Sequence, residues 1–351
     1  MQPNVVLPLL SSILSFVFAL FLVDQWRERR KPYQLIWTLG MLWYGISAGT
    51  EFWGGAFGWS ETVYRLWYLF GAVYVAAWLG LGTIFLLGKT RFGYGAAFSF
   101  LLAGLFTFLS WAKYQYADSL GTQFVYPLVA IGTAVLLAVV TYRSKARWTT
   151  VAGALVVGGS ILAIPLVLTA PLAAPGYYID PATGIPAGQL FPGFVRLLAP
   201  LFNITGSFAL TFGALYSTYV FMPKNRVIRY ELDRSKGALR FVGTLPVAAA
   251  AITVNLVASL PGAAKALVTG KLHSRVPATL LLALGAFVPS ITSGLNRFGM
   301  TAAFFLGEFL GVVFLFAGFL VSIEVFREFR VPFTGIVLRS RNETAPGGEA
   351  A

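Results

Sequence analysis

Cysteine is absent from this 351-residue chain, and histidine occurs once, as His273. The lack of cysteine excludes disulfide bonds, thiolate metal sites and cysteine nucleophiles. A single histidine excludes a bis-histidine haem, a multi-histidine zinc or copper site and a histidine-based catalytic triad. The sequence also lacks a phosphate-binding Gly-rich loop followed by Lys-Ser/Thr, and it has no kinase signature. We therefore expect neither a conventional enzyme nor a resident cofactor.

Charged residues are also scarce in this chain. Only 11% of the residues are charged and 57% are hydrophobic, whereas about 25% of the residues of a soluble domain are charged. The hydrophobic residues come in blocks of about 20, the length that a helix needs to cross the hydrocarbon core of a bilayer. The alternating segments of about ten residues that are typical of membrane barrels are absent. These features predict an all-α, polytopic integral membrane protein.

The apolar blocks predict about nine transmembrane helices. Their expected ranges are 4–23, 34–56, 64–87, 93–112, 122–142, 148–170, 196–222, 276–296 and 299–323. We expect four parts along the chain: a seven-helix bundle over 1–222, a basic cytoplasmic segment over 223–275, a C-terminal transmembrane hairpin over 276–326, and a cytoplasmic tail over 327–351 that is disordered at its end. The first block has no basic residues before it and no cleavage site, which favours an uncleaved first helix.

The distribution of basic residues orients these helices. If the N-terminus lies outside, 22 of the 26 Lys and Arg residues fall in cytoplasmic segments, and only Arg65, Lys113, Arg196 and Arg297 lie outside. Such an asymmetry is typical of proteins of the cytoplasmic (plasma or cell inner) membrane. The net charge of +13 therefore indicates the lipid bilayer as a partner, and not nucleic acid.

The stretch 241–260 is apolar and long enough to span, but a single crossing there would reduce the charge split to 16 inside and 10 outside. We therefore expect 241–262 to form a re-entrant or interface-lying helical hairpin, broken at Pro261-Gly262. A hairpin that crosses twice would also preserve the orientation, but Lys265 and Lys271 disfavour burial of its second half. Whether this stretch spans, re-enters or lies at the interface stays open.

Glu308 lies well inside the last predicted span, where an ionisable side chain costs about 2.5–3.5 kcal/mol and normally faces the protein interior. It is a candidate proton or cation site. Alternatively, it is a neutral carboxyl that bonds a polar group such as Asn203 or Asn255. Its neighbours Gly307 and Gly311 form a GxxxG pattern, which permits close approach of another backbone.

Glu51 is the second acidic residue within a predicted span, and it lies near Arg65 in a region rich in aromatic residues. The rings are Trp43, Tyr44, Trp53, Trp59, Trp67, Tyr68 and Tyr74. They are typical of an interfacial aromatic belt, combined with a structural Glu51–Arg65 pair. Alternatively, they line an outward-facing pocket in which Glu51 binds a cation and Arg65 an anion. The Pro-rich outer loop 171–195 is either a plain connector or a lid.

Seven spans, an outside N-terminus and a charged exit from the seventh helix resemble the seven-helix sensory regions of bacterial signalling proteins. The resemblance concerns architecture only and implies a non-catalytic, receptor-like or sensor-like module. A related interpretation is a membrane subunit that docks a membrane or cytoplasmic protein through its basic face. The alternative is a secondary transporter or channel that uses Glu308, with 241–262 as its broken element.

Overall fold

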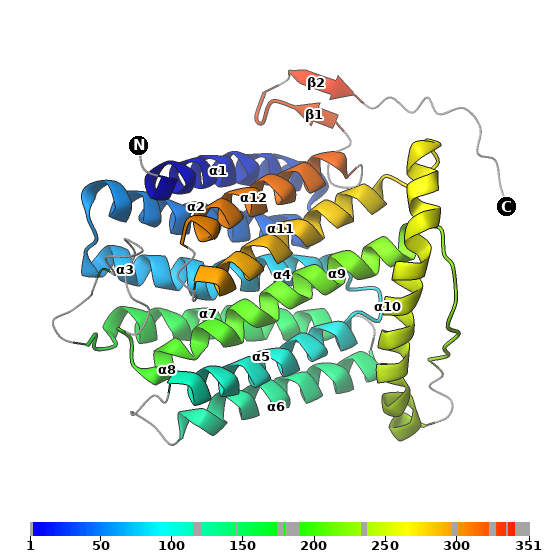
Figure 1. The fold of residues 1–351 in the computed structure, drawn as a ribbon, viewed down its shortest axis with the longest axis horizontal. Helices are drawn as coiled ribbons and strands as arrows, with labels where there is room; N and C mark the ends of the chain where they lie inside the picture. Colours follow the sequence, from blue (N-terminus) through cyan, green and yellow to red (C-terminus); the bar gives the residue numbers. More distant parts are fainter. Residues whose placement is uncertain are drawn as a thin grey trace.

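The computed structural model describes residues 3–114, 121–144, 147–173, 179, 190–232, 237–296, 301–322, 328–334 and 336–340. These residues form long helices that run side by side in one bundle, with one short β-hairpin (Figure 1). Nine of the described helices are long and apolar enough to cross a membrane. The predicted helical, multi-pass membrane class is therefore confirmed.

The helices and strands follow one another along the chain in a simple order. They are α1 (Pro3–Arg29), α2 (Pro32–Phe57), α3 (Glu61–Trp67), η1 (Tyr68–Val75), α4 (Ala76–Leu86), α5 (Gly93–Tyr114), α6 (Thr122–Arg143), α7 (Arg147–Thr169), α8 (Gly193–Arg196), η2 (Pro200–Ile204), α9 (Thr205–Phe221), α10 (Ala238–Val268), α11 (Arg275–Asn296), α12 (Thr301–Val321), β1 (Glu328–Arg330) and β2 (Val337–Ser340). Two of the bundle helices contain a π-helical stretch: η1 joins α3 to α4, and η2 precedes α9.

The set of nine apolar helices differs from the predicted set. It includes α10 and leaves out α2, although α2 lies within the bundle. Glycines and polar residues lower the hydropathy of α2. Neighbouring helices cover these residues, among them the buried Gln34, Thr38, Gly45 and Glu51. A helix that is largely enclosed by protein does not need a uniformly apolar surface.

The predicted break at Pro261-Gly262 is wrong, because α10 is one continuous helix of 31 residues. Pro246 and Pro261 both lie on its exposed side, where the helix can absorb the missing hydrogen bonds. Figure 1 shows α10 running across one end of the bundle, transverse to the other long helices.

The C-terminal hairpin α11–α12 shares one core with the N-terminal bundle. The ring of Phe18 on α1 stacks on that of Phe316 on α12, with 4.8 Å between centroids. The hydroxyls of Thr218 on α9 and Thr279 on α11 are hydrogen-bonded at 2.8 Å. The GxxxG pattern permits close approach of α11: a Cβ added at Gly311 would lie 3.1 Å from the carbonyl oxygen of Gly285.

The closest crossing in the bundle joins α4 to α9. A Cβ on Gly80 would lie 2.5 Å from the carbonyl oxygen of Gly206, and a Cβ on Gly206 would collide with the carbonyl of Ala76. Only glycine permits such contact between two backbones. The π-helical stretches η1 and η2 directly precede this crossing on their two helices and pack against each other.

The tail begins with the β1–β2 hairpin, which packs on the end of α1. The backbone N–H of Phe333 donates to Oδ1 of Asp24 at 3.2 Å, and the guanidinium of Arg27 lies 5.3 Å from the Phe333 ring centroid. The predicted disordered end, 342–351, and most of the outer loop 171–195 lie outside the described residues.

Candidate functional site

The two acidic residues that the sequence singled out within spans meet each other. Glu51 on α2 and Glu308 on α12 lie within hydrogen-bonding reach through their carboxyl groups. Oε1 of Glu51 accepts a hydrogen bond of 2.5 Å from the indole N–H of Trp67. Glu51 is only 2% exposed, whereas Glu308 is partly exposed. Both side chains therefore lie largely within the protein.

Helix geometry explains why the two side chains meet. Side chains of an α-helix tilt toward its N-terminus. Because α2 and α12 run in opposite directions (Figure 1), the side chains of Glu51 and Glu308 tilt in opposite directions along the bundle. The hydroxyl of Tyr44 on α2 donates to the backbone carbonyl of Glu308 at 2.9 Å and fixes the two helices in register.

Both residues lie about two turns from the same end of the bundle. Glu51 precedes the end of α2 by six residues and Glu308 follows the start of α12 by seven, or about 9–11 Å at 1.5 Å per residue. This end lies opposite the one that α10 crosses (Figure 1). Phe304, Phe305 and Trp59 form an apolar cluster there.

The π-helical stretch η1 adjoins the pair directly. Trp67, the indole donor to Glu51, immediately precedes η1. Gly71 within η1 packs against Ser47, which lies one turn from Glu51 on α2; a Cβ at Gly71 would collide with the Ser47 hydroxyl. Any change in the winding of η1 would therefore move the donor that holds Glu51.

Several buried polar atoms near the pair have no hydrogen-bond partner among the described residues. They include the hydroxyls of Ser11 and Ser15 on α1. The Phe18–Phe316 stacking sets the register between α1 and α12, which begin at the same end of the bundle. By this register Ser11 lies at the same depth as Glu308.

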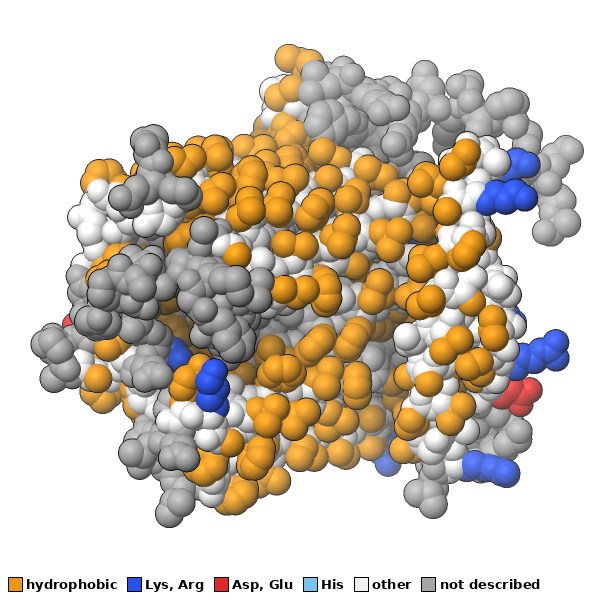
Figure 2. Space-filling view, viewed as in Figure 1, with side chains coloured by type: hydrophobic (Ala, Val, Ile, Leu, Met, Phe, Trp, Pro, Cys, Tyr) orange, Lys and Arg blue, Asp and Glu red, His pale blue; other side chains and the backbone are white. Residues whose placement is uncertain are grey.

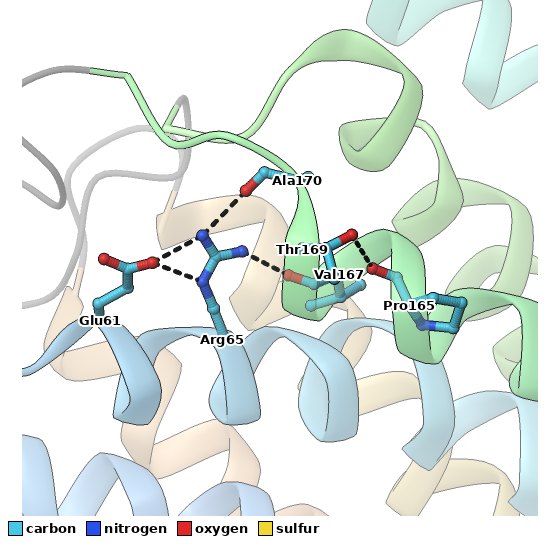
Figure 3. A network of polar contacts seen from close by, with 6 residues as sticks. All are labelled: Glu61, Arg65, Pro165, Val167, Thr169 and Ala170. Carbon is cyan, nitrogen blue, oxygen red and sulfur yellow. Dashed lines mark hydrogen bonds and ion pairs between the residues drawn. The ribbon is translucent and has the colours of Figure 1, made fainter.

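Arg65 does not pair with Glu51. Figure 3 shows its guanidinium clamped between Glu61, one turn earlier, and the end of α7. Its Nε and Nη2 donate to Oε1 of Glu61 at 2.9 and 2.7 Å. Its Nη1 donates to the carbonyl of Val167 at 2.6 Å, and Nη2 also donates to that of Ala170 at 2.9 Å. These contacts occupy the guanidinium and make it a clamp between α3 and α7, so it is not a free anion site.

Neither asparagine lies at the carboxyl pair. Oδ1 of Asn203, in η2, accepts a hydrogen bond from the hydroxyl of Ser207 at 3.2 Å. Asn255 lies on α10, where its side-chain amide bonds both backbone groups of Ile228. The expected partnership of Glu308 with either asparagine is therefore not formed.

The aromatic residues divide into two groups. Trp43 stacks on Phe70 with 5.2 Å between centroids, inside the bundle, whereas Trp53 is exposed on the surface of α2. Trp67 meets Trp59 edge-on at 5.8 Å beside Glu51. The rings therefore combine a belt residue, packed interior residues and two indoles at the carboxyl pair.

The chemistry open to this site is that of two carboxyl groups in contact. Two adjacent carboxylates in a low-dielectric environment do not both ionise, so they share a proton or bind a cation. Among the described residues, no group of three or more His, Cys, Asp or Glu side chains forms a metal site. No family model, no curated protein and no solved structure matches this chain, so no relative assigns a role to these residues.

Proposed function

We propose that this protein is a proton-coupled secondary transporter, and that Glu51 and Glu308 together hold the coupling proton. One observation carries the proposal: two carboxyl groups from helices far apart in sequence meet about two turns from one end of the bundle. An ionisable residue at this depth is expensive, and a second one in contact with it is more so. If the pair served only to hold two helices together, two amides or two apolar side chains would do so at a lower free-energy cost.

A proton suits this site better than a metal ion. Hard divalent cations take six or more oxygen ligands, whereas the described surroundings of the pair are mainly aromatic. A proton needs only the two carboxyl groups. When it leaves, the negative charge lies beside the rings of Trp67 and Trp59, a combination that attracts organic cations. We therefore propose an organic cation as the class of solute exchanged for the proton.

The irregular helices beside the site support transport. Transporters often use discontinuous helices next to their binding sites, and π-helical stretches are frequent at functional sites. Here the irregular stretches are η1 and η2, which pack against each other in two bundle helices, while α10 is continuous.

We further propose nine crossings, made by α1, α2, α3–α4, α5, α6, α7, α8–α9, α11 and α12. In this arrangement α10 lies in the membrane plane on the cytoplasmic side, and the N-terminus lies outside. The arrangement rests on the transverse course of α10 and on the basic residues at that end of the bundle. The carboxyl pair would then lie toward the outer face of the cytoplasmic membrane.

A receptor-like role, or docking of a protein partner at the basic face, is the second candidate. It uses the same orientation but does not need an ionisable pair. The observation that favours this second candidate is the exposed apolar surface of α10.

The test uses inverted membrane vesicles that carry the protein, an imposed proton gradient and a fluorescent pH indicator. A set of lipophilic organic cations is added, and proton efflux is recorded. We expect efflux with the wild-type protein, and loss of efflux in Glu51→Gln and Glu308→Gln variants that are present in equal amounts. Glu61→Gln is the matched control, because this carboxylate is 57% exposed and lies outside the pair. Equal efflux from all variants would refute a role for the pair, and no efflux with the wild-type protein would favour the receptor-like role.

A further inference from the structure

The helix α10 has two unlike faces. A stripe of small and polar residues is buried, and it consists of Ala248, Ala251, Asn255, Ser259 and Ala263. The opposite face carries Val242, Val247, Val254, Val257, Leu260 and Leu267, whose exposure ranges from 41% to 60%. No charged residue occurs between Arg240 and Lys265. A surface helix with such a face, exposed to water along its length, would be an aggregation site.

The middle of the buried stripe, at Asn255 and Ser259, is strapped to the segment 222–232 by polar contacts. The side-chain amide of Asn255 donates to the carbonyl of Ile228 at 2.8 Å and accepts from its N–H at 2.9 Å. The hydroxyl of Ser259 accepts from the N–H of Asn225 at 2.8 Å. In Figure 1 this segment runs along the side of α10 that faces away from the bundle. The apolar face lies on the opposite side of α10 from these contacts and is exposed.

The strapped segment supplies charge beside the uncharged stretch of α10 between Arg240 and Lys265. Lys224, Arg226 and Arg229 are all exposed on it, and Glu231 is its one acidic residue. Figure 2 shows hydrophobic side chains covering the visible face of α10 and of the bundle, with Lys and Arg at the margin beyond α10. Helices that lie in a membrane interface combine an apolar face with a cationic one. Here the two faces come from two separate pieces of chain.

We infer that α10 and the segment 222–232 together form an in-plane binding site for anionic phospholipids of the cytoplasmic leaflet. The valine and leucine face lies among acyl chains, and Lys224, Arg226 and Arg229 bind the phosphate headgroups. This inference rests on the proposed in-plane placement of α10, but not on transport by the carboxyl pair. Charge complementarity selects lipid as the occupant, because the three cations lie across α10 from an apolar face without a charged residue of its own, the arrangement of an interfacial helix.

The first experiment determines the depth of each face. The chain has no cysteine, so single cysteines can be introduced and spin-labelled without background. In lipid nanodiscs we expect a label at Val257→Cys to meet oxygen dissolved in the lipid, and a label at Val227→Cys to meet a water-soluble nickel chelate. A water-accessible label at Val257→Cys would overturn the inference, because this face would then be free for a protein partner.

The second experiment measures lipid selectivity with spin-labelled phosphatidylglycerol and phosphatidylcholine. We expect the wild-type protein to prefer the anionic lipid in a salt-sensitive manner. In the Lys224→Gln/Arg226→Gln/Arg229→Gln variant, the preference for phosphatidylglycerol over phosphatidylcholine should be at least about fivefold weaker than in the wild type. A single basic residue at a membrane surface already contributes about this factor. Lys113→Gln, an exposed cation at the opposite end of the bundle, is the control and should retain the preference. An unchanged preference in the triple variant would overturn the inference and leave proton coupling at Glu308 untouched.

Discussion

The clamp formed by Arg65 is the contact whose contribution to the free energy of unfolding can be estimated most directly from the structure. An Arg65→Met substitution keeps most of the side-chain volume and removes every hydrogen bond of the guanidinium. The lost acceptors are the carboxylate of Glu61 and the carbonyls of Val167 and Ala170. The two carbonyls belong to the C-terminal end of α7, where backbone acceptors have no intrahelical donor.

The magnitude follows from the type of each contact. A hydrogen bond to a charged group contributes about 1.5–3 kcal/mol, and a buried acceptor left unpaired adds its own desolvation cost. We therefore expect Arg65→Met to lower the free energy of unfolding by about 3–5 kcal/mol. The carboxylate of Glu61 is 57% exposed, so Glu61→Gln should cost about 0–1 kcal/mol. Arg65→Lys keeps the charge but not the planar fork of donors, and it should fall between them.

The assay is thermal inactivation of the purified protein in one detergent, monitored by the fraction that remains monodisperse. The expected order of stability is wild type, then Glu61→Gln, then Arg65→Lys, then Arg65→Met. If Arg65→Met proved as stable as Glu61→Gln, the two α7 carbonyls would contribute nothing, and the clamp would be only an exposed ion pair.

Three other predictions follow from the packing, the pair and the course of α10. Gly206→Ala should destabilise the protein strongly, because the added Cβ collides with the α4 backbone, whereas Gly158→Ala, which meets nothing within 4 Å, should be tolerated in the same thermal assay. Glu308→Gln should fold and remain stable, but Glu308→Leu should lose about 1–3 kcal/mol, because it leaves Glu51 without its polar neighbour. Single cysteines at Arg240 and Lys271 should react with an impermeant reagent from the same side of the membrane; labelling from opposite sides would make α10 a crossing helix.

Much of the fold was predictable because hydrophobic length alone requires it. Blocks of about 20 apolar residues leave few alternatives to membrane helices, and the structure contains nine helices of that kind within its described part. The same criterion selects α10 and leaves out α2. α2 is enclosed by the bundle and tolerates polar residues, whereas α10 is as apolar as a span but lies across the end of the bundle. Hydropathy reports composition, and the direction of a helix depends on its packing.

The candidate site was predictable in its residues but not in their partnership. Glu51 and Glu308 were both identified from the cost of an intramembrane carboxyl, but the partners considered for them were Arg65 and the two asparagines, and not each other. The signal that links them is their equal distance from the same end of the bundle. That signal becomes usable only when α2 and α12 are known to be neighbours. The continuous course of α10 through Pro261 was missed because proline weakens a helix without always ending it.

The central claim is that Glu51 and Glu308 share one exchangeable proton, and infrared difference spectroscopy of the protein in lipid tests it most directly. A pH step should reveal the carbonyl stretch of a protonated carboxylic acid, and this band should shift when the water is replaced by D₂O. We predict that the band is lost in both Glu51→Gln and Glu308→Gln and kept in Glu61→Gln, because neither member of the pair holds the proton alone. A band that persists unchanged in both pair variants would contradict the account.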